Sequence, residues 1–141
     1  MNKVIAILLV GMLSVAATAE IFIYEGKYEG IQVGVSSKNQ VVNLKGKPIR
    51  KSVVLSDETF HYDGFQIRFD RNTVSTISIV NPEYSDPNGI SVGFSQIVLE
   101  AVLKSEVVKD TLVDKNKGII YWVENGVVSK IVIAYKLKLN G

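Results

Sequence analysis

Few residues in this chain could carry out acid–base or nucleophilic chemistry. His61 is the only histidine, and there is no cysteine. A zinc site needs several histidine, cysteine or carboxylate ligands, and a catalytic serine would need His61 as its base. No serine lies in a Gly-x-Ser-x-Gly turn, and the glycines at Gly26, Gly30 and Gly34 lack the spacing of a phosphate-binding loop. We therefore expect no metal, no cofactor and no nucleophilic catalysis.

Paired carboxylates are the remaining catalytic possibility. Asp57, Glu58, Asp63 and Asp70 lie around one predicted hairpin. Two facing acids of this kind could hydrolyse a glycosidic bond. Acids at strand ends and turns are usually hydrated and unpaired. A small envelope hydrolase is therefore the alternative, and a protein that is not an enzyme is the main prediction.

Side chains on one face of the predicted strands are better candidates for function. Successive residues of a strand point to opposite faces, so the segment Phe65-Gln66-Ile67-Arg68-Phe69 directs its apolar residues to one side. Gln66 and Arg68 then point to the other side. His61 lies on the preceding strand and shares that face. We predict that these three residues contribute to a binding surface.

A later strand offers larger anchors on the corresponding face. Ile120 and Trp122 occupy the positions of Gln66 and Arg68 when the two segments are aligned. Tryptophan and arginine are frequent anchors of protein interfaces. In the other possible arrangement, the segment Ile21–Tyr24 of the same chain covers this face. Both readings remain open from the sequence.

The elements that position these residues are short helices and antiparallel strands. Residues 59–62 and 65–69 flank Asp63-Gly64, a pair typical of type I′ hairpins. Ser37 and Gln40 have capping-box spacing and predict a helix that ends before Gly46. A second helix is expected from Ser95 to about Lys104.

Two parts of the chain repeat the same pattern. Residues 30–34 match 89–93 at an offset of 59 (89 − 30), and the hairpin from Gly64 to Val80 matches the stretch from Gly118 onward at an offset of 54 (118 − 64). Repeats at such periods indicate duplicated structural units. We expect a single domain at 20–141, made of repeats at about 26–80 and 89–135 that are joined by a linker at 81–88.

The predicted fold class is α+β. Each repeat supplies a helix and an antiparallel hairpin with one apolar side to cover. Two repeats can cover these sides by extending one sheet with both helices on the same face. The product is a two-layer domain with one open sheet face, as antiparallel sheets allow.

The amino terminus predicts export. Lys3 precedes an apolar run from Val4 to Leu13, and Ala17-Thr18-Ala19 resembles a cleavage site, so residues 1–19 are expected to be a signal peptide. The remaining chain, with 15 basic and 14 acidic residues, has a net charge near +1. This balance gives no indication of a nucleic-acid partner. No membrane span or lipidated cysteine is expected, and the predicted location is periplasmic or secreted.

Some segments resemble a known superfamily. Gly30-Ile31-x-Val33-Gly34-x-Ser36-x-Lys38-x-x-Val41, closed by Gly46-Lys47-Pro48, is similar to the helix-opening segment of the SmpA/OmlA and beta-lactamase-inhibitor-protein-like (BLIP-like) superfamily. Asn125-Gly126-Val127-Val128-x-Lys130-Ile131 resembles the strand pair that follows it there. The resemblance implies a helix-on-sheet repeat whose open face grips a protein, as an inhibitor or an envelope assembly factor. The chain lacks the lipidated cysteine of the lipoprotein members.

Together these features predict an exported, non-catalytic protein-binding module. Its partner would be a protein of the cell envelope or of the medium. The candidate binding residues are Trp122, Ile120, Arg68, His61 and Gln66.

Overall fold

The computed structural model describes residues 27–134. The predicted signal peptide, the segment Ile21–Tyr24 and Tyr135 at the end of the second hairpin lie outside the described residues. Within residues 27–134, no helix combines the length and the apolar character needed to cross a bilayer.

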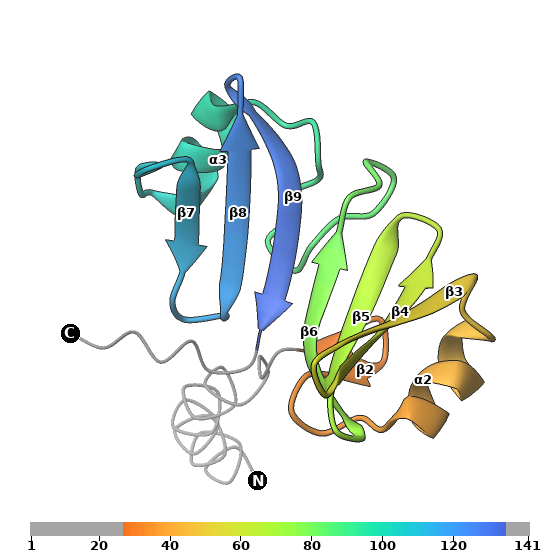
Figure 1. The fold of residues 1–141 in the computed structure, drawn as a ribbon. Helices are drawn as coiled ribbons and strands as arrows, with labels where there is room; N and C mark the ends of the chain where they lie inside the picture. Colours follow the sequence, from red (N-terminus) through yellow and green to blue (C-terminus); the bar gives the residue numbers. More distant parts are fainter. Residues whose placement is uncertain (1–26, 135–141) are drawn as a thin grey trace, which may run out of the picture.

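The described chain forms an α+β fold with a seven-stranded antiparallel sheet and two helices (Figure 1). The strand order is β3-β4-β5-β6-β9-β8-β7. The strands are β3 (Arg50–Val54), β4 (Asp57–Tyr62), β5 (Phe65–Asp70), β6 (Thr73–Ile79), β7 (Thr111–Asp114), β8 (Ile119–Glu124) and β9 (Val127–Ala134). A separate two-stranded ribbon consists of β1 (Lys27–Tyr28) and β2 (Ile31–Gln32).

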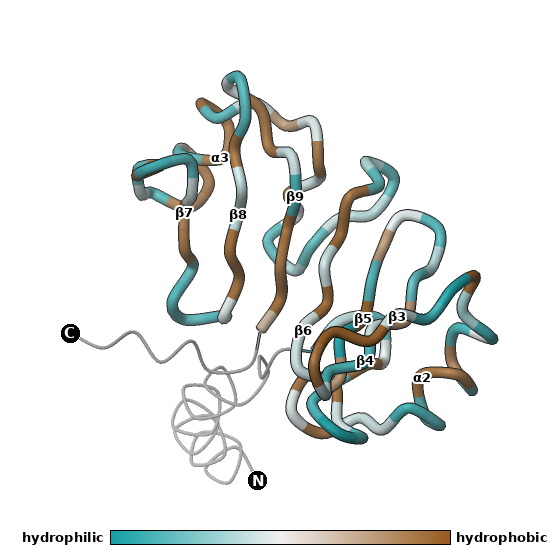
Figure 2. Tube along the Cα trace, viewed as in Figure 1, coloured by the Kyte–Doolittle hydropathy of each residue, from teal (hydrophilic) through white to brown (hydrophobic). Residues whose placement is uncertain are grey.

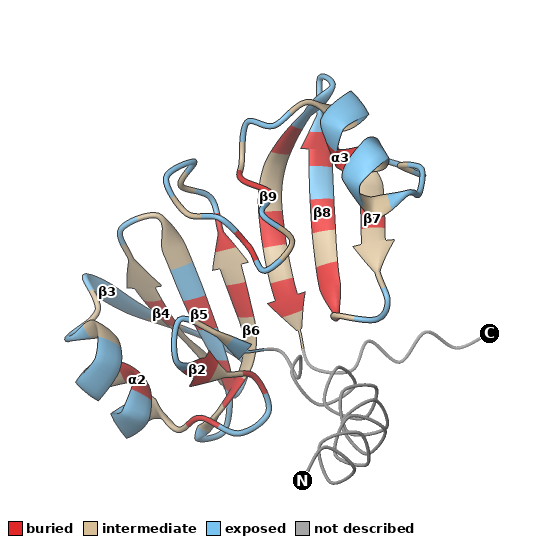
Figure 3. Ribbon diagram, turned by 180° about the vertical axis from the view of Figure 1, so that it is seen from behind, coloured by how far each residue is buried: buried red, intermediate tan, exposed pale blue. Residues whose placement is uncertain are grey.

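The two halves of the sheet meet where β6 pairs with β9. Ile77 lies opposite Ile133, and Ile79 lies opposite Ile131, and all four side chains are buried. Side chains from both halves belong to one apolar core, which covers a single face of the sheet. The alternation of apolar and polar residues along these strands is visible in Figure 2, and the buried positions are visible in Figure 3. The predicted α+β class and an open antiparallel sheet are therefore confirmed, whereas the division into tandem repeats is not shown.

Both predicted helices are present. α2 (Lys38–Lys45) begins with the expected capping box, in which Gln40 N donates to Ser37 Oγ at 3.2 Å and Ser37 N donates to Gln40 Oε1 at 2.9 Å. α3 (Gln96–Leu103) begins after Ser95, whose Oγ accepts from the Val98 N–H. Each helix buries one side chain in the core, Val41 and Leu99 respectively.

The apolar residues of α3 are mostly at the surface. Ile97 is 79% exposed, and Val98 and Val102 are 43% and 49% exposed. Their helical spacing suggests a packed face, but Leu99 is the fully buried residue of this helix, and Leu103 packs partly buried against the core. Helical periodicity identifies an apolar side without fixing which residue on it meets the sheet.

The two long hairpins share several backbone features. A β-bulge interrupts the pairing of β5 between Arg68 and Phe69, and another interrupts that of β8 between Trp122 and Val123. Ser75 Oγ donates to the Arg68 carbonyl at 3.1 Å, and Ser129 Oγ donates to the Trp122 carbonyl at 3.2 Å. Both the bulges and the serine contacts are separated by 54 residues (122 − 68 and 129 − 75).

Two turns have different geometries. Asn125 and Gly126 have φ angles of 52° and 77°, as a type I′ turn requires at both central positions. At the first hairpin Gly64 has a φ of 86°, whereas Asp63 is not among the residues with positive φ. The prediction of a type I′ turn at Asp63-Gly64 is therefore wrong, although Tyr62 pairs with Phe65 as expected.

Residues 81–88, the predicted linker, pack against both halves of the sheet. The Tyr84 ring meets the Phe65 ring edge-on, with 5.7 Å between centroids. Asp86 is buried and accepts a hydrogen bond from the Tyr121 hydroxyl on β8. This segment therefore ties β5 to β8 on the core side.

The junction of β6 and β9 generates a stability prediction. Replacing Ile133 with alanine should lower the free energy of unfolding by about 2–5 kcal/mol, because it removes a fully buried side chain at the centre of the core. Urea denaturation monitored by circular dichroism measures this change.

The matched control is Ile97→Ala on the exposed side of α3. Its effect should stay within about 0.5 kcal/mol, since surface substitutions rarely cost more. Equal losses for the two variants would contradict the placement of the core.

Candidate functional site

A shallow trough crosses the sheet face that lies opposite the helices, here called the open face. Its volume is about 440 Å³, and side chains from β3, β4, β5, β6, β8 and β9 line it. The lining includes Gln66, Arg68, Ile120, Trp122, Lys130 and Val132. The trough therefore spans both halves of the sheet.

The trough brings together four of the five residues predicted from the sequence. Gln66 and Arg68 project into it from β5, and Ile120 and Trp122 project into it from β8. β6 and β9 separate these two strands in the sheet. His61 lies beside Gln66 in the β4–β5 pairing but does not line the trough.

The two ends of the trough differ in chemistry. The β4–β6 end is polar and is lined by Asp57, Thr59, Gln66, Arg68, Thr76 and Ser78. At the β8–β9 end, Ile120, Trp122 and Val132 provide apolar surface beside the ammonium group of Lys130. Val54 on β3 adds one apolar side chain beside Asp57, so the first end is mainly polar and the second is mainly apolar.

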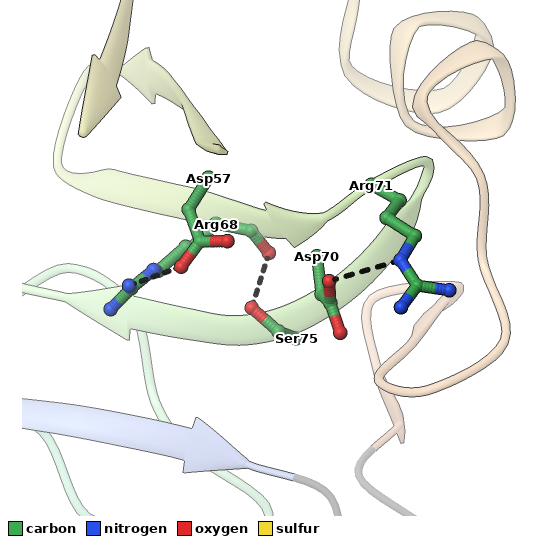
Figure 4. Close-up of polar contacts among 5 residues, drawn as sticks. All are labelled: Asp57, Arg68, Asp70, Arg71 and Ser75. Carbon is green, nitrogen blue, oxygen red and sulfur yellow. Dashed lines mark hydrogen bonds and ion pairs between the residues drawn. The ribbon is translucent and has the colours of Figure 1, made fainter. Parts of the chain in front are cut away.

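Arg68 is the main charged group of the polar end. Its Nη2 is ion-paired with Asp57 Oδ2 on the neighbouring strand (Figure 4). The arginine side chain is still 52% exposed, so part of the guanidinium faces solvent. The hydrogen bond from Ser75 to its carbonyl holds the bulge next to it. The nearby pair of Arg71 and Asp70 is more exposed and contributes little to stability.

Trp122 dominates the apolar end. It is 40% exposed, although it belongs to a strand whose alternate residues are fully buried. Lys130 lies opposite it on β9, with Nζ 5.2 Å from the centroid of its rings. A cation at this distance from an indole is attracted to the ring face. The contact keeps a positive charge beside the tryptophan.

His61 has a structural role in the β3–β4 pairing. Its Nδ1 is 3.3 Å from Arg50 Nη2, and its Nε2 is 2.7 Å from Ser52 Oγ. Arginine can only donate, so Nδ1 accepts and Nε2 carries the proton. Partial burial, followed by the Arg50 charge, lowers the pKa of His61 below its usual value of 6.5. The neutral ring is therefore the form that the fold favours.

The carboxylates do not form a catalytic pair in the trough. Within residues 27–134, Asp57 is the only acid in its lining, and Arg68 neutralises it. Glu58 is instead 3.4 Å from Lys38 Nζ. The described residues also contain no cluster of three histidine, aspartate or glutamate side chains able to hold a metal ion. Among the described residues of the trough lining, no second acid faces Asp57.

Sequence reasoning missed a polar cluster on the core side of the sheet. Asp86 accepts from the backbone N–H groups of Asn88 and Ile90 at 2.9 and 2.8 Å, as well as from Tyr121. Lys117 Nζ donates to Asn88 Oδ1 at 2.6 Å. Burial raises the pKa of Asp86 above its usual value, although these hydrogen bonds act in the opposite direction. The cluster is satisfied internally and fixes residues 86–90 against β8.

Comparisons with known proteins identify a fold likeness only. No family model matches the chain, and no curated protein matches it. The crystal structure of an extracellular protein containing an SCP domain, from Bacillus anthracis str. Ames, is similar with a TM-score of 0.51 and 8% sequence identity. The similarity covers 71% of this chain and 43% of that protein. The chain therefore spans less than half the length of that neighbour.

The resemblance to the SmpA/OmlA and BLIP-like superfamily is wrong. The structural likeness is to the SCP-domain protein, and no family model matches. The residues that suggested the resemblance are turn glycines with positive φ and helix-capping residues such as Ser37. Many helix-on-sheet units need such residues at these places, so they identify a local structure and not a family.

The environment of His61 predicts a dependence of stability on pH. Because the folded-state pKa lies below the unfolded value of 6.5, the stability that the neutral ring contributes is complete above about pH 6.5. It is lost as the pH falls through the folded-state pKa. Urea unfolding at pH 7.5 and pH 5 should therefore show a larger loss on acidification for the native chain than for His61→Gln. Since this is the only histidine, equal losses would contradict the assignment.

Proposed function

We propose that the chain is an exported, non-catalytic module that binds a protein partner in the trough of its open face. The observation that carries this proposal is the meeting of Trp122, Ile120, Arg68 and Gln66 in one trough, from strands that belong to different hairpins. An exposed tryptophan and a half-exposed arginine on a rigid sheet are typical anchors for a protein interface.

A sheet is a suitable support for such anchors. β5 and β8 are paired on both sides, and a bulge held by a serine hydroxyl adjoins each of the two largest anchors. The backbone of paired strands has little freedom left to lose when a partner binds, and the contacts of Arg68 with Asp57 and of Trp122 with Lys130 restrain the side chains, which reduces the entropic cost of association. Arg68 and Trp122 are therefore presented in a pre-organised way.

We also infer that the two halves arose by duplication. The shared spacing of 54 residues between bulges and between serine contacts supports this origin. Core positions keep their apolar character, as in Ile67 and Tyr121. The open-face positions diverge, with Arg68 corresponding to Trp122. A change from arginine to tryptophan at one position of the same surface would give the two halves different binding chemistry.

Export is supported by two observations. Residues 1–19 have the charge and apolar run of a signal peptide. The structural neighbour from Bacillus anthracis is described as extracellular. The partner is therefore sought in the cell envelope or in the medium.

Capture from a native envelope extract tests the proposal. Trp122→Ala and Arg68→Ala should each weaken retention of the partner at least about tenfold, because each removes an anchor of the trough. Circular dichroism and thermal unfolding should stay close to those of the native chain, since both side chains are exposed.

Ile97→Ala serves as a control on the opposite side of the domain and should retain the partner normally. Full retention of the partner by both trough variants would contradict the proposed binding surface. Loss of retention by all three variants would indicate a general folding defect.

A further inference from the structure

The trough runs diagonally across the sheet from Arg68 to Trp122. In the sheet register, Arg68 lies opposite Thr76, and Thr76 lies opposite Ala134 on β9. Trp122 lies opposite Lys130, which is four residues from Ala134 on the same strand. Three inter-strand spacings and four residue steps place the two anchors roughly 20 Å apart. About six residues of extended polypeptide cover that length.

The charges in the trough favour an anionic occupant. Two of the lining residues, Arg68 and Lys130, are cations, and Asp57 is the one acid among the described residues of the lining. Asp57 is already paired with Arg68. Lys130 has no carboxylate partner within residues 27–134, and its ammonium group lies over the Trp122 ring. An incoming carboxylate would complete the charge pairing at this end.

Apolar surface adjoins the unpaired cation. Ile120 lies between Val132 on β9 and Val113 on β7, and it is next but one to Trp122 along β8. An aliphatic or aromatic side chain placed here would cover Trp122 and remove apolar area from water. Because Lys130 lies beside Trp122, a ligand that contacts both residues needs an acidic group close to an apolar one.

We propose that the trough binds an extended polypeptide segment of about six residues in which an acidic side chain is close to an apolar one. Lys130 binds the carboxylate, and Ile120 and Trp122 hold the apolar side chain. This inference rests on the proposed function and specifies the chemistry of the partner.

Selection from a displayed library of random heptapeptides tests the proposal. The chain from residue 20 to residue 141 should enrich peptides that combine Asp or Glu with an aliphatic or aromatic residue. Lys130→Glu should lose the preference for acids and bind a labelled synthetic copy of the leading peptide at least about tenfold more weakly. Lys115→Glu makes the same charge change on an exposed turn outside the trough and should behave as the native chain does.

The outcomes separate this inference from the proposed function. Neutral or basic peptides that still require Trp122 would overturn the acidic recognition and leave protein binding by the trough in place. Failure to enrich any peptide, or enrichment that is unchanged by Trp122→Ala, would overturn the peptide proposal. Protein binding by the trough would be overturned only if the envelope partner is also fully retained by the Trp122→Ala and Arg68→Ala variants.

Two further results would show that the trough has a different occupant. Enrichment that appears only after removal of residues 20–26 or 135–141 would assign the trough to an end of the same chain. A dimer in sedimentation that Trp122→Ala dissociates would assign it to a second copy. Either result overturns the proposal.

Discussion

The antiparallel pairing of β6 with β9 is the constraint on which the rest of the structure depends. It places Ile77 against Ile133 on the core face and Ser78 against Val132 on the open face. Because side chains alternate strictly along a strand, a slip of one residue would exchange the two faces. The buried pairs therefore determine which residues line the trough.

This constraint also links the two anchors. Arg68 and Trp122 belong to hairpins that are joined only through β6 and β9 within the sheet. A bulge follows each residue, and a serine hydroxyl from the next strand binds its carbonyl. The core thus holds two chemically different side chains on one surface at a fixed separation. That arrangement can discriminate between ligands by the order of their charged and apolar groups.

Local patterns in the sequence predict much of this fold. Ser37 and Gln40 cap α2 as expected, and the alternation of Phe65 to Phe69 places Arg68 on the open face. Such features depend on neighbouring residues, so they can be read from short segments. The same alternation places Gln66, Arg68, Ile120 and Trp122 on the face that carries the trough.

Features that depend on distant contacts were not predicted. β3 and β7 are the edge strands, and β3 is largely exposed, so it lacks the alternation that marks a half-buried strand. Lys130 was missed, and Asp57 was considered only as a possible catalytic acid, because their roles in the trough come from cross-strand neighbours, Trp122 and Arg68 respectively. The superfamily resemblance failed for a related reason, since capping and turn residues report local geometry and carry no information about ancestry.

The fluorescence of Trp122 tests the central claim most directly, because it is the only tryptophan in the chain. If the trough is free to bind a partner, iodide should quench the whole emission of the protein. Iodide should also quench more strongly than caesium, since Lys130 attracts the anion to the ring. Emission that neither ion quenches would show that another segment covers Trp122, and it would contradict the account of an accessible binding face.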